Sequence, residues 1–124
     1  MAAWDERLSN FGVLGCFAMT EIGHGSFVRG LETTATFDAA TDEFVVHSPT
    51  PTAGKCWIGS AGQTATHAVV YAQLVSAGKH HGLNAFIVPL RDMETGAPLP
   101  GVMCYDMGAK MGRNSLDNGL MCVP

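Results

Sequence analysis

The chain contains few charged residues and no excess of positive ones. Asp, Glu, Lys and Arg make up 15% of its 124 residues, and the formal net charge is −4. Nucleic acids and anionic membranes are attracted by clustered Lys and Arg, which this composition does not provide. No apolar run approaches the roughly 20 residues that a membrane-spanning helix requires. The composition therefore argues against nucleic-acid and membrane partners.

A secretory signal and paired cysteines are also lacking. The segment Met1–Arg7 does not show the basic-then-apolar order of a secretory signal. The four cysteines, which form no C-x-x-C pair, are Cys16, Cys56, Cys104 and Cys122. Four cysteines could form disulfides, but small apolar side chains in a reducing compartment are the simpler interpretation.

Hydrophobic residues are abundant, at 47% of the chain. This share excludes a disordered segment, and the length favours one domain with a true core. The share is slightly high for a self-sufficient domain. We therefore expect part of the apolar surface to belong to interfaces with segments that this chain lacks.

Fifteen glycines and six prolines divide the chain into short segments. The segments between them are rich in β-branched and aromatic residues and predict seven strands. These runs are Val13–Thr20, Glu32–Phe37, Glu43–His47, His67–Val75, Ala85–Leu90, Val102–Tyr105 and Leu120–Val123. Short strands with a turn every ten residues or so predict an all-β barrel or sandwich with little helix.

Local patterns refine three of these segments. Thr34–Phe37 alternates threonine with apolar residues, and Asp38–Asp42 is typical of a turn, so a hairpin with Glu43–His47 is expected. Ala65–Ser76 also suits a helix, but its Val-Val-Tyr centre favours a strand. Asp92–Pro100, with one glycine and two prolines, predicts a loop.

The segment Gly15–Ser26, GCFAMTEIGHGS, resembles the signature of the acyl-CoA dehydrogenase and oxidase superfamily. In that family an aromatic-x-x-T-E-x-x-x-G-S stretch of the middle β-domain lies over the flavin. Further blocks resemble the oxidase branch: RGLETTATFD from Arg29, EFVVHSPT from Glu43, GLNAFIVPLRD from Gly82, LPGV from Leu99 and LDNG from Leu116. Several linked motifs at consistent spacing are more specific than any one of them.

The resemblance implies that residues 1–124 form a single flavin-binding middle domain, matched most strongly over residues 15–119. The family fold implied is a β-barrel of two packed antiparallel sheets. Relatives are larger α+β enzymes with helical domains on both sides, which are expected to be absent from this chain.

The resemblance also implies FAD as the cofactor. The threonine at the place of Thr20 hydrogen-bonds the flavin ring near O4 and N5 in relatives, Gly59 matches a second flavin contact, and Trp57 matches an aromatic beside the ring. Gly25 and Ser26 match the loop near the pyrophosphate or thioester, where backbone N–H groups can hold an anion. The full set of expected cofactor-binding residues is Phe17, Met19, Thr20, Gly25, Ser26, Trp57 and Gly59.

The reaction implied by the family is oxidation of fatty acyl-CoA to trans-2-enoyl-CoA, with O₂ reduced to H₂O₂. The catalytic carboxylate of relatives lies in the C-terminal helical domain, so no catalytic residue and no activity are expected in this chain alone. Glu21 is interpreted as structural. His24 and the pair His80-His81 are interpreted as a locally bonded loop residue and a solvated turn, and no metal site is expected.

Expected partners are fatty acyl-CoA and either the remaining oxidase domains or a second copy of the chain. The resemblance implies a peroxisomal location, although the chain carries no Ser-Lys-Leu-type address. Two alternatives stay open: a non-catalytic interaction protein built on the same domain, and an acyl-CoA dehydrogenase domain. The full-length transcript would decide the first, and O₂ consumption by a complete homologue would decide the second.

Overall fold

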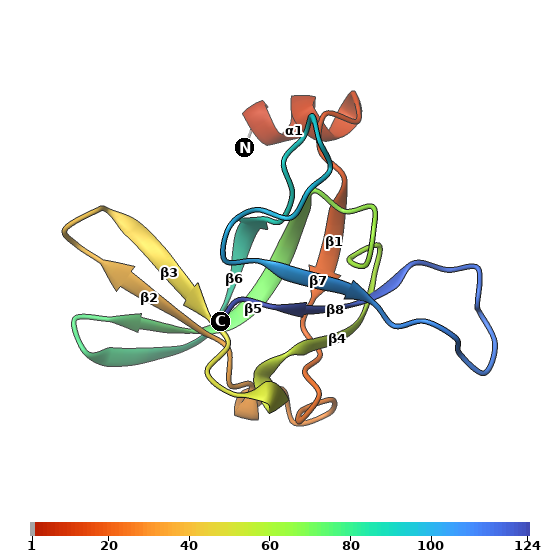
Figure 1. Ribbon diagram of the computed structural model, residues 1–124. Helices are drawn as coiled ribbons and strands as arrows, with labels where there is room; N and C mark the ends of the chain where they lie inside the picture. Colours follow the sequence, from red (N-terminus) through yellow and green to blue (C-terminus); the bar gives the residue numbers. More distant parts are fainter. Residues whose placement is uncertain (1) are drawn as a thin grey trace.

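The computed structural model describes residues 2–124, which form two β-sheets with one short α-helix (Figure 1). The helices are α1 (Ala2–Ser9) and the 3₁₀ turns η1 (Val28–Gly30) and η2 (Pro51–Ala53). The strands are β1 (Gly15–Ala18), β2 (Thr34–Asp38), β3 (Glu43–His47), β4 (Lys55–Gly59), β5 (His67–Ser76), β6 (Lys79–Pro89), β7 (Met103–Asp106) and β8 (Asn118–Cys122). The expected β architecture with little helix is confirmed. Among these residues, no helix has the length and apolar character needed to cross a bilayer.

β5 organises the larger sheet. On one edge it pairs antiparallel with β6 along its whole length. On the other edge it pairs parallel with two strands in turn: β1 beside residues 67–70 and β2 beside residues 73–75. β3 then pairs antiparallel with β2. The β5 edge therefore changes partner at Tyr71 and Ala72, and the loop from β1 to β2 leaves and rejoins the sheet there.

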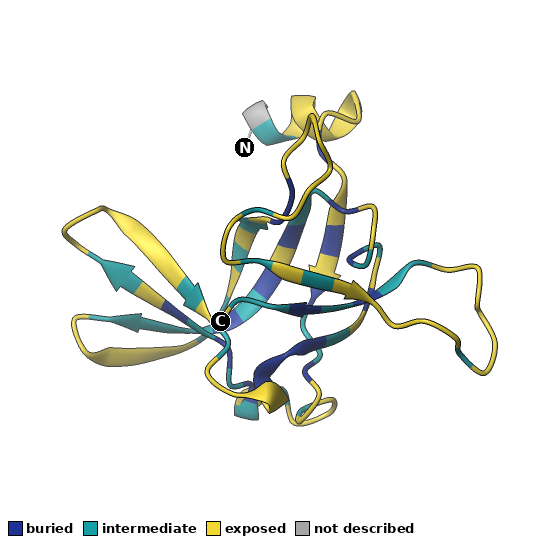
Figure 2. Ribbon diagram, viewed as in Figure 1, coloured by how far each residue is buried: buried dark blue, intermediate teal, exposed yellow. Residues whose placement is uncertain are grey.

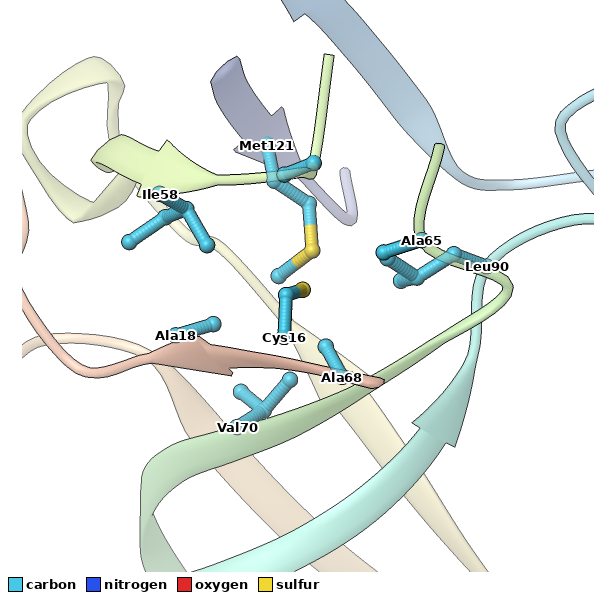
Figure 3. Close-up of a cluster of buried hydrophobic side chains, with 9 residues drawn as sticks. Cys16, Ala18, Ile58, Ala65, Ala68, Val70, Leu90 and Met121 are labelled. Carbon is cyan, nitrogen blue, oxygen red and sulfur yellow. The ribbon is translucent and has the colours of Figure 1, made fainter. Parts of the chain in front are cut away.

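The smaller sheet has the order β4-β8-β7, with both pairings antiparallel. Its inner face packs on β1 and β5, as the close-up of the core shows (Figure 3). Ile58 and Met121 point from β4 and β8 toward Cys16 and Val70 on the opposite sheet. Alternation along β1, β8 and the first part of β5 buries every second residue. Alanines fill much of the remaining core, so the two sheets approach closely.

Two hairpins project from the packed body on the left of Figure 1: β2–β3 and the far end of β5–β6. The β2–β3 hairpin expected from the sequence is present, with Thr34 opposite His47 and Asp38 opposite Glu43. Both projections are mostly exposed or half-buried (Figure 2). Rings of Phe37, Phe44 and Phe86 pack in series across them at centroid distances of 5.3 and 5.2 Å.

Several sequence expectations are corrected. The larger sheet is mixed, not antiparallel, because β1 and β2 both run parallel to β5. The pairings within residues 2–124 form two sheets and no closed barrel. β4 and α1 were not expected. His80 and His81 lie within β6 and not in a turn, because Ala77 and Gly78, both at positive φ, complete the turn earlier.

Candidate functional site

Thr20 lies just beyond β1, where the chain runs beside β4. The Cys56 N–H donates to the Thr20 carbonyl at 2.9 Å, and Glu21 forms an isolated bridge with Lys55. A hollow of about 250 Å³ opens at this junction, lined by Thr20, Glu21, Ile22, Gly25, Cys56 and Trp57. The Thr20 hydroxyl has no hydrogen-bond partner among residues 2–124. The hollow thus offers a half-buried hydroxyl to a ligand.

Trp57 forms one wall of the hollow because β4 bulges there. The pairing of β4 with β8 shifts register between Lys55 and Ile58, and Trp57 takes a φ of +52°. A bulge rotates a side chain out of the regular alternation. The Trp57 side chain is 62% exposed although its neighbours Lys55 and Ile58 are buried. A large aromatic surface is therefore held open to solvent beside Thr20.

Two glycines near the hollow leave their backbone uncovered. A Cβ added to Gly25 or Gly59 would meet no atom within 4 Å. The N–H groups of Gly25 and Ser26 donate to no other residue in the described part of the chain. Close approach of a ligand to this backbone is therefore unobstructed.

The other expected residues lie around the hollow and do not line it. Phe17 is 58% exposed on the outer face of β1, and its ring packs against Tyr71 at 5.3 Å. The Met19 carbonyl accepts a hydrogen bond from Lys55 Nζ at 3.0 Å. Thr20, Gly25 and Trp57 thus share the hollow, whereas Phe17, Met19, Ser26 and Gly59 are its neighbours in sequence.

A buried ion pair beneath the hollow fixes the backbone on both sides of Thr20. Lys55 Nζ lies 3.1 Å from Glu21 Oε1, and both side chains are almost completely buried. Besides Met19, Lys55 Nζ donates to the Tyr71 carbonyl at 2.7 Å, at the point where the β5 edge changes partner. Between β1 and β2 none of the described strands pairs with this edge of β5. The Lys55 ammonium group supplies the hydrogen bond that the Tyr71 carbonyl would otherwise receive from a neighbouring strand.

Both carboxylate oxygens of Glu21 accept hydrogen bonds in this network. Oε1 accepts from the Thr33 hydroxyl at 2.6 Å and the Thr33 N–H at 2.9 Å, and Oε2 accepts from the Glu32 N–H at 2.7 Å. Burial raises the pKa of the Glu21 carboxyl, but these bonds and the Lys55 charge outweigh it and hold the pKa below the usual 4.5. Burial lowers the pKa of Lys55 below 10.5, against the opposing effect of Glu21. The interpretation of Glu21 as structural is supported.

Lys55 was missed from the sequence, where it was only the start of a KCWIG run. A lysine among apolar residues, 34 positions from Glu21, gives no local indication that the two will pair.

His24 contacts the same region from the β1–β2 loop. Its Nε2 lies 3.7 Å from Glu32 Oε2, and donor atoms of Glu21, His24 and Glu32 lie within 4.8 Å of one another. Glu32 Oε2 also accepts from the Thr52 hydroxyl at 2.6 Å and the Thr50 hydroxyl at 3.1 Å. The group is therefore a hydrogen-bonded network that ties the β1–β2 loop to η2.

Other hollows lie along the hairpins and α1. The two larger ones, of about 340 and 920 Å³, are open and include Phe44 in their walls. None of the seven expected cofactor-binding residues lines them. The junction at Thr20 is therefore the candidate site, despite its smaller volume.

Comparison with known proteins gives consistent results. Residues 16–123 match the family described as acyl-CoA dehydrogenase, middle domain. Peroxisomal acyl-coenzyme A oxidase 1 of Arabidopsis thaliana is 53% identical over 121 residues, which cover 95% of this chain and 18% of that protein. The chain thus spans less than a fifth of that relative's length.

Solved structures of acyl-CoA oxidases have the same fold. The enzyme from tomato (Lycopersicon esculentum) has a TM-score of 0.96 and 52% identity, covering 99% of this chain and 19% of that one. Acyl-CoA oxidase-2 of Caenorhabditis elegans, bound with FAD, ascaroside-CoA and ATP, has a TM-score of 0.95 and 45% identity over the same shares. The chain therefore belongs to the acyl-CoA dehydrogenase and oxidase superfamily, as a middle domain of the acyl-CoA oxidase type.

Proposed function

We propose that this chain is the FAD-binding domain of an acyl-CoA oxidase that converts fatty acyl-CoA to trans-2-enoyl-CoA and reduces O₂ to H₂O₂. The observation that carries the proposal is the junction of β1 and β4, where the unpaired Thr20 hydroxyl lies beside the exposed Trp57. A peroxisomal location and a fatty acyl-CoA substrate belong to the same proposal and are supported by the names of the relatives.

The residues present fit a flavin. A planar ring needs an aromatic or apolar wall and a few fixed polar groups at its edge, and Trp57 and the Thr20 hydroxyl are placed to supply these. Gly59 leaves its backbone open to close approach, and the free N–H groups of Gly25 and Ser26 suit an anion such as a pyrophosphate. Bound FAD would accept the two electrons removed from the acyl chain.

In this proposal the residues of this chain orient the flavin, and none of them removes the proton from the substrate. The Thr20 hydroxyl would hydrogen-bond to the edge of a bound flavin ring, and the Lys55–Glu21 pair fixes the backbone that carries this hydroxyl. One such neutral hydrogen bond contributes about 1 kcal/mol net, so it tunes the ring and does not retain it alone. The carboxylate that removes the α-proton comes from another part of the enzyme.

Replacement of Thr20 tests the cofactor site. In a chimaeric oxidase, with these 124 residues replacing the corresponding segment of the tomato enzyme, Thr20→Val keeps the shape and removes the hydroxyl. We expect weaker FAD retention or a shifted flavin potential with unchanged thermal unfolding. Gly59→Ala is the matched steric variant: its Cβ meets nothing in the chain, so FAD affinity should fall while the fold is kept. Unchanged FAD affinity and potential in both variants would place the flavin elsewhere.

The isolated chain should show no oxidase activity. The hollow of about 250 Å³ is smaller than the roughly 300–1,000 Å³ of typical ligand sites, and its Trp57 wall is exposed to solvent. By itself it would not enclose the flavin and the acyl chain, so water would reach them and the orientation of the reactants would be lost. The measurement is peroxide release from the purified chain with excess FAD and palmitoyl-CoA, compared with the chimaeric oxidase. Peroxide from the isolated chain that Glu21→Gln abolishes would show that Glu21 is the base.

A further inference from the structure

The segment that follows Trp57 has an unusual backbone. Residues 60–65 form a turn from β4 to β5, here called the 60–65 turn. Ser60, which directly follows Gly59, has a φ of +67°, and Trp57 has a φ of +52°. Residues with a Cβ disfavour this left-handed region, so such a conformation persists only where surrounding contacts impose it.

Asp117, just before β8, binds the N–H groups of the 60–65 turn. Its Oδ1 accepts from the Gly62 N–H at 2.9 Å, and its Oδ2 accepts from the N–H groups of Gln63 and Thr64 at 3.0 Å. Its main-chain carbonyl accepts from the Ser60 N–H at 2.8 Å. Successive N–H groups that converge on one anion form a nest, and here the anion is the chain's own side chain.

Arg91, just after β6, binds the carbonyl groups of the same turn. Its guanidinium donates to the carbonyls of Ala61 and Gly62 at 2.8 Å and of Ala65 at 2.7 Å. The side chain is buried, with 5% of the residue exposed. The guanidinium fork has fixed donor directions, so it fixes the position of the three carbonyls as well as binding them.

Asp117 and Arg91 both bind main-chain groups of the 60–65 turn and do not pair with each other. Within residues 2–124 neither Asp117 nor Arg91 forms an ion pair with another side chain. One charge holds the N–H groups and the other holds the carbonyls, while the Ser60 carbonyl accepts from Ala65 and Thr64. Ser60 is therefore fixed through both its N–H and its carbonyl, next to the open backbone of Gly59.

We propose that Asp117 and Arg91 are positioning residues of the flavin site. By holding the 60–65 turn, they keep Ser60 in its left-handed conformation and so orient the Gly59–Ser60 peptide toward the flavin. This inference rests on the proposed function, because the flavin is the group toward which the peptide is oriented.

The test uses the holo chimaeric oxidase. Asp117→Asn removes the charge and directs an amide donor at N–H groups, so we expect the FAD dissociation constant to rise roughly tenfold, with a shifted flavin midpoint potential. Arg91→Lys, which keeps the charge but loses the fork, should act in the same direction and replaces Asp117→Asn if that variant does not fold. Asp38→Asn is the matched control, since the Asp38 carboxylate also accepts a backbone N–H, that of Ala40, and lies in the β2–β3 hairpin away from the 60–65 turn.

Ser60→Gly distinguishes positioning from general stabilisation. Glycine adopts positive φ without strain, so Ser60→Gly combined with Asp117→Asn should recover much of the affinity and potential. If Asp117→Asn and Arg91→Lys lower the unfolding temperature but leave FAD affinity and potential unchanged, the two residues are only structural and the inference is wrong. Failure of the unmodified chimaera to retain FAD would instead refute the proposed function, and the inference with it.

Discussion

Replacing Lys55 with methionine should destabilise the domain by about 3–5 kcal/mol, because it leaves a buried carboxylate without its partner. Methionine fills a similar volume but cannot donate to Glu21, Met19 or Tyr71. A loss of this size is a large part of the stability of an ordinary domain. Urea unfolding of the purified chain, followed by far-UV circular dichroism, measures it.

Two controls distinguish loss of the Lys55–Glu21 interaction from the general effect of removing a lysine. Lys79→Met removes an exposed lysine of β6 and should change stability by no more than about 0.5 kcal/mol. The double variant Lys55→Met/Glu21→Gln should lose less stability than the sum of the two single variants. Strict additivity would show that Lys55 and Glu21 do not interact energetically.

The same network predicts the direction of the pH dependence. The pKa of Glu21 is lowered on folding, so its contribution to stability is complete above the usual value of 4.5. That contribution is lost as pH falls through the lowered pKa of the folded state. The Glu21→Gln variant should therefore show a weaker decline in stability at acid pH than the unmodified chain.

Gly119→Ala should be the most damaging change of a single methyl group, with a loss of about 3 kcal/mol or more from overpacking. A Cβ on Gly119 would press on the Gly62 nitrogen and lie 2.8 Å from the Ala61 carbonyl carbon. These are backbone atoms that Asp117 and Arg91 hold in place, so they cannot move aside cheaply. The thermal unfolding temperature of the purified chain is the measurement.

Gly15→Ala is the matched control, because a Cβ there would meet nothing within 4 Å. It lies in the exposed part of β1 at an ordinary φ, so stability should be unchanged or slightly raised. Equal destabilisation by both substitutions would mean that β8 does not pack on the 60–65 turn as described.

The strands were predictable because their chemistry is local. All seven expected runs overlap a strand, although β6 begins at Lys79, well before the expected Ala85, and Asp38–Asp42 leads through the turn between β2 and β3. β4 was missed because its bulge at Trp57 breaks the alternation that identifies a strand. The parallel pairing of β1 and β2 with one edge of β5 was missed as well, since strand direction depends on connections that alternation does not encode.

The candidate site was only partly predictable, and mainly through family resemblance. Thr20, Gly25 and Trp57 share one hollow, and their role toward FAD stays a prediction. The residues that hold this backbone were not found from sequence: Lys55, Arg91 and Asp117. Each is a charged side chain that hydrogen-bonds to main-chain groups of distant segments, and Lys55 also pairs with Glu21. Because every residue has main-chain polar groups, the sequence does not indicate which of these groups a charged side chain binds.

The shared edge of β5 has a consequence for synthesis and folding of the chain. Among the strands described, three pairings join consecutive strands: β2–β3, β5–β6 and β7–β8. The other pairings join distant segments, since Gly15 pairs with His67 and Gly59 with Asn118. Long-range pairings of this kind slow folding because loop closure precedes any gain in contacts. When synthesis has reached the end of β4, Lys55 is present, but its partner Tyr71 and the rest of β5 have not yet been made. We expect productive folding to begin only once β5 has left the ribosome, and to finish with β8.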